Sequence, residues 1–185
     1  MVRQIKGIIC AVRLHGENGA IVRLLTPDNG LVSGYVRGAR SRINRPTLIC
    51  GNSVAAELRQ RSPGQLASMS IELVASRAPL LGEPLAAAAI EWSTALVAAT
   101  LPEDQPHADV YSALNGLLGA IAAAPSARRW AGAVIAFERL ILFALGYGGA
   151  AGVHHDDWPS VLADLTENGG RLSRHLLSDR RAALL

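Results

Sequence analysis

Four arginines fall within the nine residues from Arg37 to Arg45, the other two being Arg40 and Arg42. Glycine, alanine and polar residues fill most of the positions between them. A planar guanidinium group can donate two parallel hydrogen bonds to phosphate oxygens, which the lysine ammonium group cannot do. One interpretation is a solvated loop without a ligand. The rest of the sequence favours another, a loop that binds a polyanion at the mouth of a small β-barrel.

Further arginines and one tyrosine could extend this surface if the predicted strands close into a barrel. The candidate residues for nucleic-acid binding are Arg13, Arg23, Tyr35, Arg37, Arg40, Arg42, Arg45, Arg59 and Arg61. Tyr35 is the only aromatic residue before Pro79, so the barrel cannot offer a ladder of base-stacking rings. Tyr35 could stack on one base, or it could be a core or edge residue of its strand. We therefore expect contacts with the nucleic-acid backbone that do not depend on base sequence.

No convincing catalytic constellation accompanies these residues. The best metal-binding candidate is the run His154-His155-Asp156-Asp157, whose members are sequence neighbours in a glycine-rich loop. They lack partner groups at a known ligand spacing, and a solvated loop followed by an Asp N-cap is the favoured interpretation. Glycine-rich nucleotide motifs and the nucleophile elbow are missing as well. We expect no enzyme activity, cofactor or metal, with a hydrolase or metal enzyme using His154, His155 and Asp156 as the alternative.

Five short segments with strand periodicity must position the arginines. They are Ile5–Leu14, Ala20–Thr26, Leu31–Val36, Ser53–Arg59 and Leu66–Val74. Turn-forming glycine, proline and Asx residues lie between several of them. Five strands in roughly seventy-five residues predict a small closed or nearly closed antiparallel barrel. The five-stranded oligonucleotide-binding (OB) fold is the common solution of that size.

Around Pro79 the pattern changes from strands to helices. The expected helices run from Pro84 to about Thr100, from about Ala108 to Ala123, from a cap at Ser126 to Gly146, from Asp157 to Leu165, and from Ser173 onward. Asn168-Gly169-Gly170 is expected to separate the last two. The chain is therefore predicted to be α+β and multidomain, with an OB-like barrel over residues 1–77 and an all-α domain over residues 78–185. That second domain would pack against the barrel or be tethered beside it.

Charge is distributed unevenly between these two parts. Up to Arg77 there are eleven Arg or Lys residues against four acids, a surplus of seven, whereas from Ala78 onward seven stand against eleven, a deficit of four. This asymmetry indicates that the first part meets a polyanion. Cys10 and Cys50 form no metal-ligand pattern, the start of the chain lacks the features of a signal peptide, and no apolar segment is suited to span a membrane. A reducing cytoplasm without membrane association is the expected setting.

Several of these residues, taken in order, resemble the RecO family of bacterial recombination mediators. The matching features are an acidic turn and strand from Glu17 to Thr26, Gly30, the loop Arg37-Gly38-Ala39-Arg40 followed by Arg45, the segment Phe137–Leu140 and the helix stop Leu145-Gly146-Tyr147. Two departures stand out. The family's acidic turn usually carries an Asp-Arg pair where this chain has Gly19-Ala20. Many members have a four-cysteine zinc module after the helix stop, but no cysteine follows here, so no zinc site is carried over.

The resemblance implies a protein without turnover that binds single- and double-stranded DNA and anneals complementary strands. It also implies cooperation with RecR in loading recombinase onto DNA coated by single-stranded-DNA-binding protein, whose acidic C-terminal tail it would contact. A cytoplasmic, nucleoid-associated location follows from that role. The alternative from another class is an RNA-binding or ribosome-associated OB-fold protein, because phosphate contacts do not identify the sugar.

Overall fold

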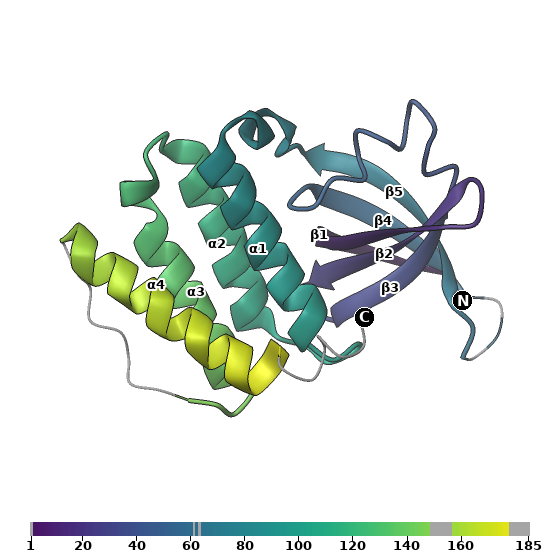
Figure 1. The fold of residues 1–185 in the computed structure, drawn as a ribbon. Coiled ribbons are helices and arrows are strands. Elements are labelled where there is room, and N and C mark those ends of the chain that lie inside the picture. The colour runs from purple at the N-terminus through teal and green to yellow at the C-terminus, as the bar shows by residue number, and fades with distance from the viewer. Residues whose placement is uncertain (1, 61, 63, 149–156, 178–185) are drawn as a thin grey trace.

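The computed structural model describes residues 2–60, 62, 64–148 and 157–177 (Figure 1). The strands are β1 (Val2–His15), β2 (Gly19–Thr26), β3 (Gly30–Arg37), β4 (Ser53–Arg59) and β5 (Ala67–Ala75). The α-helices are α1 (Pro84–Thr100), α2 (Ala108–Ala123), α3 (Ala131–Ala144) and α4 (Trp158–Leu172). Short 3-10 turns span Ala78–Gly82 and Ala127–Arg129, and a π-helical turn spans Ser173–Leu177. The predicted fold class, a five-stranded barrel followed by helices, is confirmed.

The strands form a closed barrel in the order β1-β2-β3-β5-β4. Every neighbouring pair is antiparallel except β3 and β5, which pair in parallel through Gly34 with Ala67 and Tyr35 with Ser68. Alternate residues point inward and fill the barrel, as the period of two requires. The buried inward-facing residues include Ile5, Ile9, Val22, Leu24, Val32, Val36, Val54, Ala56, Leu58 and Met69. Closure leaves no strand edge open for pairing, so a ligand can meet only the outer strand faces and the connecting loops.

The helices pack against one end of the barrel, as Figure 1 shows. Ile8, Leu25 and Leu31 of the barrel belong to the same buried cluster as apolar residues of α1, α2 and α3. The linker between α1 and α2 also touches the barrel, because the Asp104 N–H donates to the Leu31 carbonyl oxygen at 3.0 Å. Of the two arrangements left open by the sequence, packing and tethering, the structure has packing. The opposite end of the barrel is left free.

An apolar stripe on α3, together with Trp130 just before it, forms the centre of the helical part. Trp130, Val134, Phe137 and Ile141 are all buried. The helix stops where expected, because Gly146 adopts a φ of 83° that other residues rarely reach. Ser126 precedes the short 3-10 turn and makes no side-chain cap. No helix in the described ranges is long and apolar enough to cross a membrane.

The expected break at Asn168-Gly169-Gly170 is wrong, because α4 runs through it without interruption. Each glycine costs a helix only about 1 kcal/mol relative to alanine, and tertiary contacts offset that cost. The Asn168 side chain is buried and donates to the Ile135 carbonyl oxygen of α3 at 3.3 Å. Arg171 donates to the Tyr147 and Gly148 carbonyl oxygens, each at 2.8 Å. At the other end of α4, Asp157 is the predicted N-cap and accepts a hydrogen bond from the Ser160 N–H at 2.9 Å.

Candidate nucleic-acid interface

Strand pairing places three candidate residues in one row around the barrel. Arg13 pairs with Ile21, and Ile21 pairs with Tyr35. Tyr35 pairs with Ser68, and Ser68 pairs with Arg59. Because directly paired residues point to the same face of a sheet, Arg13, Tyr35 and Arg59 share the outer face. Four strand spacings of about 4.8 Å separate the two arginines, roughly 19 Å around the barrel.

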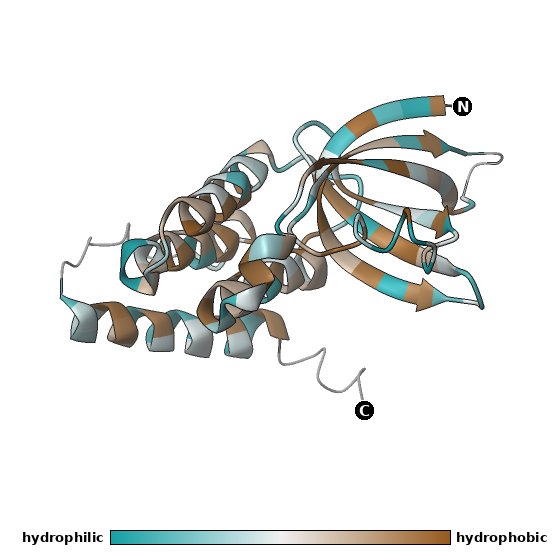
Figure 2. Cartoon of the chain, turned by 90° about the horizontal axis from the view of Figure 1, so that it is seen from above, coloured by the Kyte–Doolittle hydropathy of each residue, from teal (hydrophilic) through white to brown (hydrophobic). Residues whose placement is uncertain are grey.

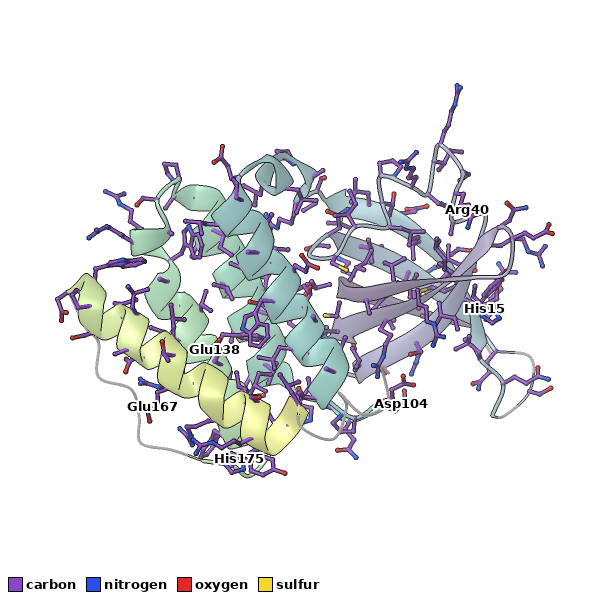
Figure 3. All side chains as sticks on the ribbon, in the orientation of Figure 1. His15, Arg40, Asp104, Glu138, Glu167 and His175 are labelled. Atoms are coloured by element: carbon purple, nitrogen blue, oxygen red, sulfur yellow. The ribbon has the colours of Figure 1, made fainter. Side chains whose placement is uncertain are left out.

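Arg37 connects this row to the loop between β3 and β4, residues 38–52, which we call the arginine loop. Arg37 ends β3 two residues after Tyr35, and therefore lies on the same face. The loop is attached to the β1–β2 turn, because the Ala39 N–H donates to the Asn18 carbonyl oxygen at 2.8 Å. Figure 3 shows Arg40 of the loop and His15, the last residue of β1, at the end of the barrel remote from the helices. Figure 2 shows hydrophilic residues along the loops of that end.

Internal hydrogen bonds give the arginine loop a defined path. The Asn44 side chain donates to the Arg37 and Gly38 carbonyl oxygens at 3.0 and 3.1 Å. At the other end of the loop, the fully buried Asn52 side chain donates to the Pro46 and Thr47 carbonyl oxygens at 3.1 and 3.0 Å. Neither asparagine was among the candidate residues. Side chains that hydrogen-bond nearby backbone are typical of asparagine in loops, so Asn44 within the arginine cluster and Asn52 after it were the available signal.

The guanidinium groups of this end are free to meet a ligand. Arg13, Arg37, Arg40, Arg42 and Arg45 are exposed. None of the five has an ion pair with any residue that the structure describes. Arg59 is also exposed and pairs with Glu57 of its own strand at 2.7 Å, but such exposed pairs contribute at most about 1 kcal/mol. We call these six residues the arginine surface.

Two other candidates do not join the arginine surface. Arg23 lies halfway along β2 and is half-buried. Its guanidinium group donates to the Ala98 carbonyl oxygen of α1 and forms an ion pair with Glu103 at 3.1 Å. Arg23 therefore connects the barrel to the helical part. Arg61 lies outside the described residues.

Tyr35 belongs to the row but is only half exposed. Its ring lies over Gly19, where a Cβ atom would overlap the ring. The edge of the ring meets His15, with the two ring centroids 6.3 Å apart and nearly perpendicular. Glycine at position 19, one of the departures from the family pattern, is what leaves room for the tyrosine. One ring held in this way cannot provide a stacking platform for several bases.

The arginine loop and β1 also line an open hollow of about 360 Å³. Four apolar side chains line it, Val12 and Leu14 from β1 and Ala39 and Leu48 from the loop. Arg40 and Arg45 complete its lining. The hollow was not predicted, because it depends on how the loop folds back over the strand.

Nucleophiles and metal ligands are poorly placed in the described part of the chain. Burial raises the pKa of Cys10 to about 12 and also raises the pKa of Cys50, so both remain thiols at neutral pH. The described residues contain no group of three or more His, Cys, Asp or Glu side chains that could hold a metal ion. The candidates His154, His155 and Asp156 lie outside those residues.

Two family models match the chain, and together they include most of it. The model of the Recombination protein O N terminal matches residues 1–77, which contain the barrel. The model of the Recombination protein O C terminal matches residues 82–149, which contain α1 to α3.

Curated relatives named DNA repair protein RecO are similar over the same region. The protein of Rhodospirillum rubrum is 41% identical over 146 residues, which cover 77% of this chain and 58% of the relative. The proteins of Gluconacetobacter diazotrophicus and Phenylobacterium zucineum are 38% and 39% identical, and each match covers 76% of this chain and 57% of the relative. The chain thus spans less than two thirds of the length of these relatives. Since both of its parts match, the chain belongs to the RecO family of DNA repair proteins.

Proposed function

We propose that the chain is a DNA-binding repair mediator without catalytic turnover. It binds single- and double-stranded DNA through the phosphate backbone, promotes annealing of complementary strands, and assists recombinase loading together with RecR. In this proposal it also contacts the acidic C-terminal tail of single-stranded-DNA-binding protein, and it acts in the cytoplasm in association with the nucleoid. It uses neither a metal nor a cofactor.

The observation that carries the proposal is the arginine surface at the free end of a closed five-stranded barrel. OB barrels bind oligonucleotides across strands β2 and β3 and between the β1–β2 and β4–β5 turns. Arg13, Arg37 and Arg59 lie on or beside those elements. The arginine loop adds three more guanidinium groups at the same end. Because the helices pack against the other end, they leave this surface open to DNA.

The chemistry of the surface favours the backbone over the bases. Each guanidinium group can bind a phosphate bidentately, and each phosphate neutralised on a single strand steepens the salt dependence of binding by about 0.7. Such contacts hold strands of any sequence. A protein that neutralises two strands at once lowers the repulsion between them, and this is the physical basis for annealing.

Replacing Arg37, Arg40, Arg42 and Arg45 by Glu tests the proposal. Fluorescence anisotropy of a labelled DNA oligonucleotide across a salt series should show that binding is abolished. The melting temperature should be nearly unchanged, because the four side chains are exposed. The matched control uses two double variants. One carries Arg40→Glu and Arg42→Glu in the loop, and the other carries Arg128→Glu and Arg129→Glu on the helical part, where both arginines are also exposed. The two double variants carry the same net charge. A larger loss of DNA affinity in the loop variant would therefore identify a binding site there, rather than a general attraction between the protein and DNA.

Further assays separate the parts of the proposal. Annealing of complementary oligonucleotides, measured by fluorescence quenching, should fail in the fourfold variant. Anisotropy with RNA of the same sequence should show no preference over DNA, whereas clear preference for RNA would favour the alternative of an RNA-binding or ribosome-associated barrel. Unaltered DNA binding by the fourfold variant would move the site away from the arginine surface. Copurification with RecR tests the partner assignment.

A further inference from the structure

The hollow between β1 and the arginine loop combines an apolar lining with two cations. Its volume of about 360 Å³ is near the lower end of the roughly 300–1,000 Å³ of small-ligand sites. Leu14 contributes to the lining although 55% of it is exposed. Leucine beside guanidinium groups on an open face stays in contact with water unless something covers it, so the hollow suits a ligand that is apolar in one part and anionic in the next.

A nucleotide unit of a DNA strand has this composition. The base is flat and has apolar faces, and the phosphates on either side of it are anionic. We propose that the hollow receives one unpaired base of a bound strand, with Val12, Leu14 and Leu48 against the base and a flanking phosphate on Arg40 or Arg45. This inference rests on the proposed function and assigns it a base-binding site.

A peptide with an acidic residue next to an apolar one would share part of this chemistry. The DNA strand is favoured because the cations continue beyond the hollow. Arg37 and Arg42 lie in the same segment and are exposed, and a strand supplies a phosphate at every nucleotide to meet them. The Tyr35 ring is held over Gly19 and meets the exposed His15 edge-on, and the apolar hollow adds a second way to hold a base.

The hollow has a consequence for strand preference. In a duplex the bases are paired and stacked, and extruding one costs a few kcal/mol. A duplex therefore reaches only the arginines, whereas a single strand reaches the arginines and the hollow. Single strands should bind more tightly than duplexes, even though duplex DNA has the higher charge density.

An abasic oligonucleotide tests this directly, because it keeps every phosphate and lacks the bases. We compare oligonucleotides of about 16 units, the upper end of the site size of one OB barrel. The wild-type chain should bind the thymine strand about tenfold more tightly than the abasic strand, which corresponds to about 1.4 kcal/mol. A fluorescent aminopurine in the strand should brighten on binding, because it leaves its stacked neighbours for a hollow that contains no aromatic ring.

Leu14→Gln should remove the tighter binding of the thymine strand and the rise in aminopurine fluorescence. It should leave the affinity for the abasic strand and for duplex DNA unchanged. Since Leu14 is largely exposed, this variant should fold normally, and its melting temperature checks that. Leu85→Gln is the matched control, because Leu85 is 65% exposed on α1, far from the hollow. It should behave as the wild type does.

The outcomes separate this inference from the proposed function. Equal binding of thymine and abasic strands by the wild type, with strong binding of both, would overturn the base site and leave backbone binding intact. Failure to bind either strand would overturn the proposed function itself. Release of a bound abasic strand by an acidic peptide with an apolar end, lost in Leu14→Gln, would assign the hollow to a protein partner instead.

Discussion

Asn44 carries no charge, yet it sets the path of the arginine loop. Its side chain donates to two carbonyl oxygens at the start of the loop. Its own N–H donates to the Ser41 hydroxyl oxygen at 3.1 Å. In the proposed function, these bonds hold the arginines near the positions from which they would bind DNA. Ordering a loop in advance lowers the entropic cost of binding.

Asn44→Ala should therefore weaken DNA binding without changing any charge. We expect about a fivefold loss of affinity, or about 1 kcal/mol, the scale of ordering one side chain or losing one hydrogen bond. The slope of affinity against salt should stay the same, because it counts phosphates. Anisotropy across a salt series measures both quantities, and Asn115→Ala on the exposed face of α2 is the control. A reduced slope would mean that Asn44 itself contacts the backbone.

Arg23 shows how an arginine of the barrel can serve the fold. Its guanidinium group contacts α1 and the following linker through Ala98 and Glu103. Arg23→Gln should lower the free energy of unfolding by about 1 kcal/mol, because the pair is partly exposed to solvent. It should leave the affinity for DNA nearly unchanged.

Arg40→Gln is the reciprocal variant and should lower the affinity with little effect on unfolding. Chemical denaturation gives the free energy of unfolding of each variant, and anisotropy gives the affinity of each variant for DNA. A large loss of DNA affinity in Arg23→Gln with normal stability would instead make Arg23 part of the DNA-binding site. The sequence could not separate these roles, because the partners of Arg23 lie 75 or more residues away along the chain.

At the scale of elements, α1, α3 and α4 meet at a buried carboxyl group. Glu138 of α3 is 3% exposed and accepts a hydrogen bond from the Trp92 indole N–H of α1 at 2.8 Å. Burial raises the pKa of Glu138, and this outweighs Trp92, Asn168 and Arg139, which lower it. Because the folded state holds the proton more tightly than the unfolded state, this group stabilises the fold most at low pH. That contribution is lost as the pH rises through the raised pKa.

Glu138→Gln removes this pH dependence while keeping an acceptor for Trp92. The melting temperature of the variant relative to the wild type should rise between pH 5 and pH 8, two values that lie above the usual pKa of about 4.3 for glutamate. Differential scanning calorimetry over that range measures it. Glu167→Gln, on the exposed face of α4, should give a difference that does not vary with pH. A constant difference for Glu138→Gln would mean that its carboxyl group titrates alike in both states.

The elements differ in how far the sequence predicts them. The strands are predictable because their apolar residues alternate over whole segments, as Val54, Ala56 and Leu58 do in β4. The continuation of α4 through two glycines is not, since it depends on the contact of Asn168 with α3. The arginines of the loop are visible in the sequence as a cluster. The path of the loop, and with it the hollow, depends on which carbonyl oxygens the Asn44 and Asn52 side chains reach. The sequence shows these asparagines but not their partners.

At the scale of the whole molecule, an apolar cluster that is distinct from the one inside the barrel joins the barrel to the helices. Ile8, Leu25 and Leu31 are fully buried within the cluster formed by the helices. Removing the helices would expose these side chains, at a cost of about 1.5–3 kcal/mol for each large apolar residue. We therefore expect the barrel and helices to unfold together in one transition. On this expectation, the barrel and the helices differ in architecture but form one folding unit.

Gly30 lies where the barrel meets the linker, and its replacement tests this coupling. Its φ is +67°, and a Cβ atom there would overlap the Gln105 carbonyl oxygen. Gly30→Ala should cost roughly 2–5 kcal/mol, the sum of the left-handed backbone penalty and overpacking. Circular dichroism of the helices and the fluorescence of the tryptophans, all of which lie after residue 91, should show the same lowered melting temperature, although the change is made in the barrel.

Gly16→Ala separates the two costs, because Gly16 has nearly the same φ, +66°, and a Cβ atom there would meet no other group within 4 Å. It should cost only about 1–2 kcal/mol, the backbone penalty alone. The excess in Gly30→Ala then measures how firmly the linker is held against the barrel. Two separate transitions in Gly30→Ala, with the helices melting at the wild-type temperature, would contradict the coupling of the barrel to the helices. In that case the arginine surface would sit on a barrel that folds by itself, and the helices would be free to change position when DNA or a partner binds.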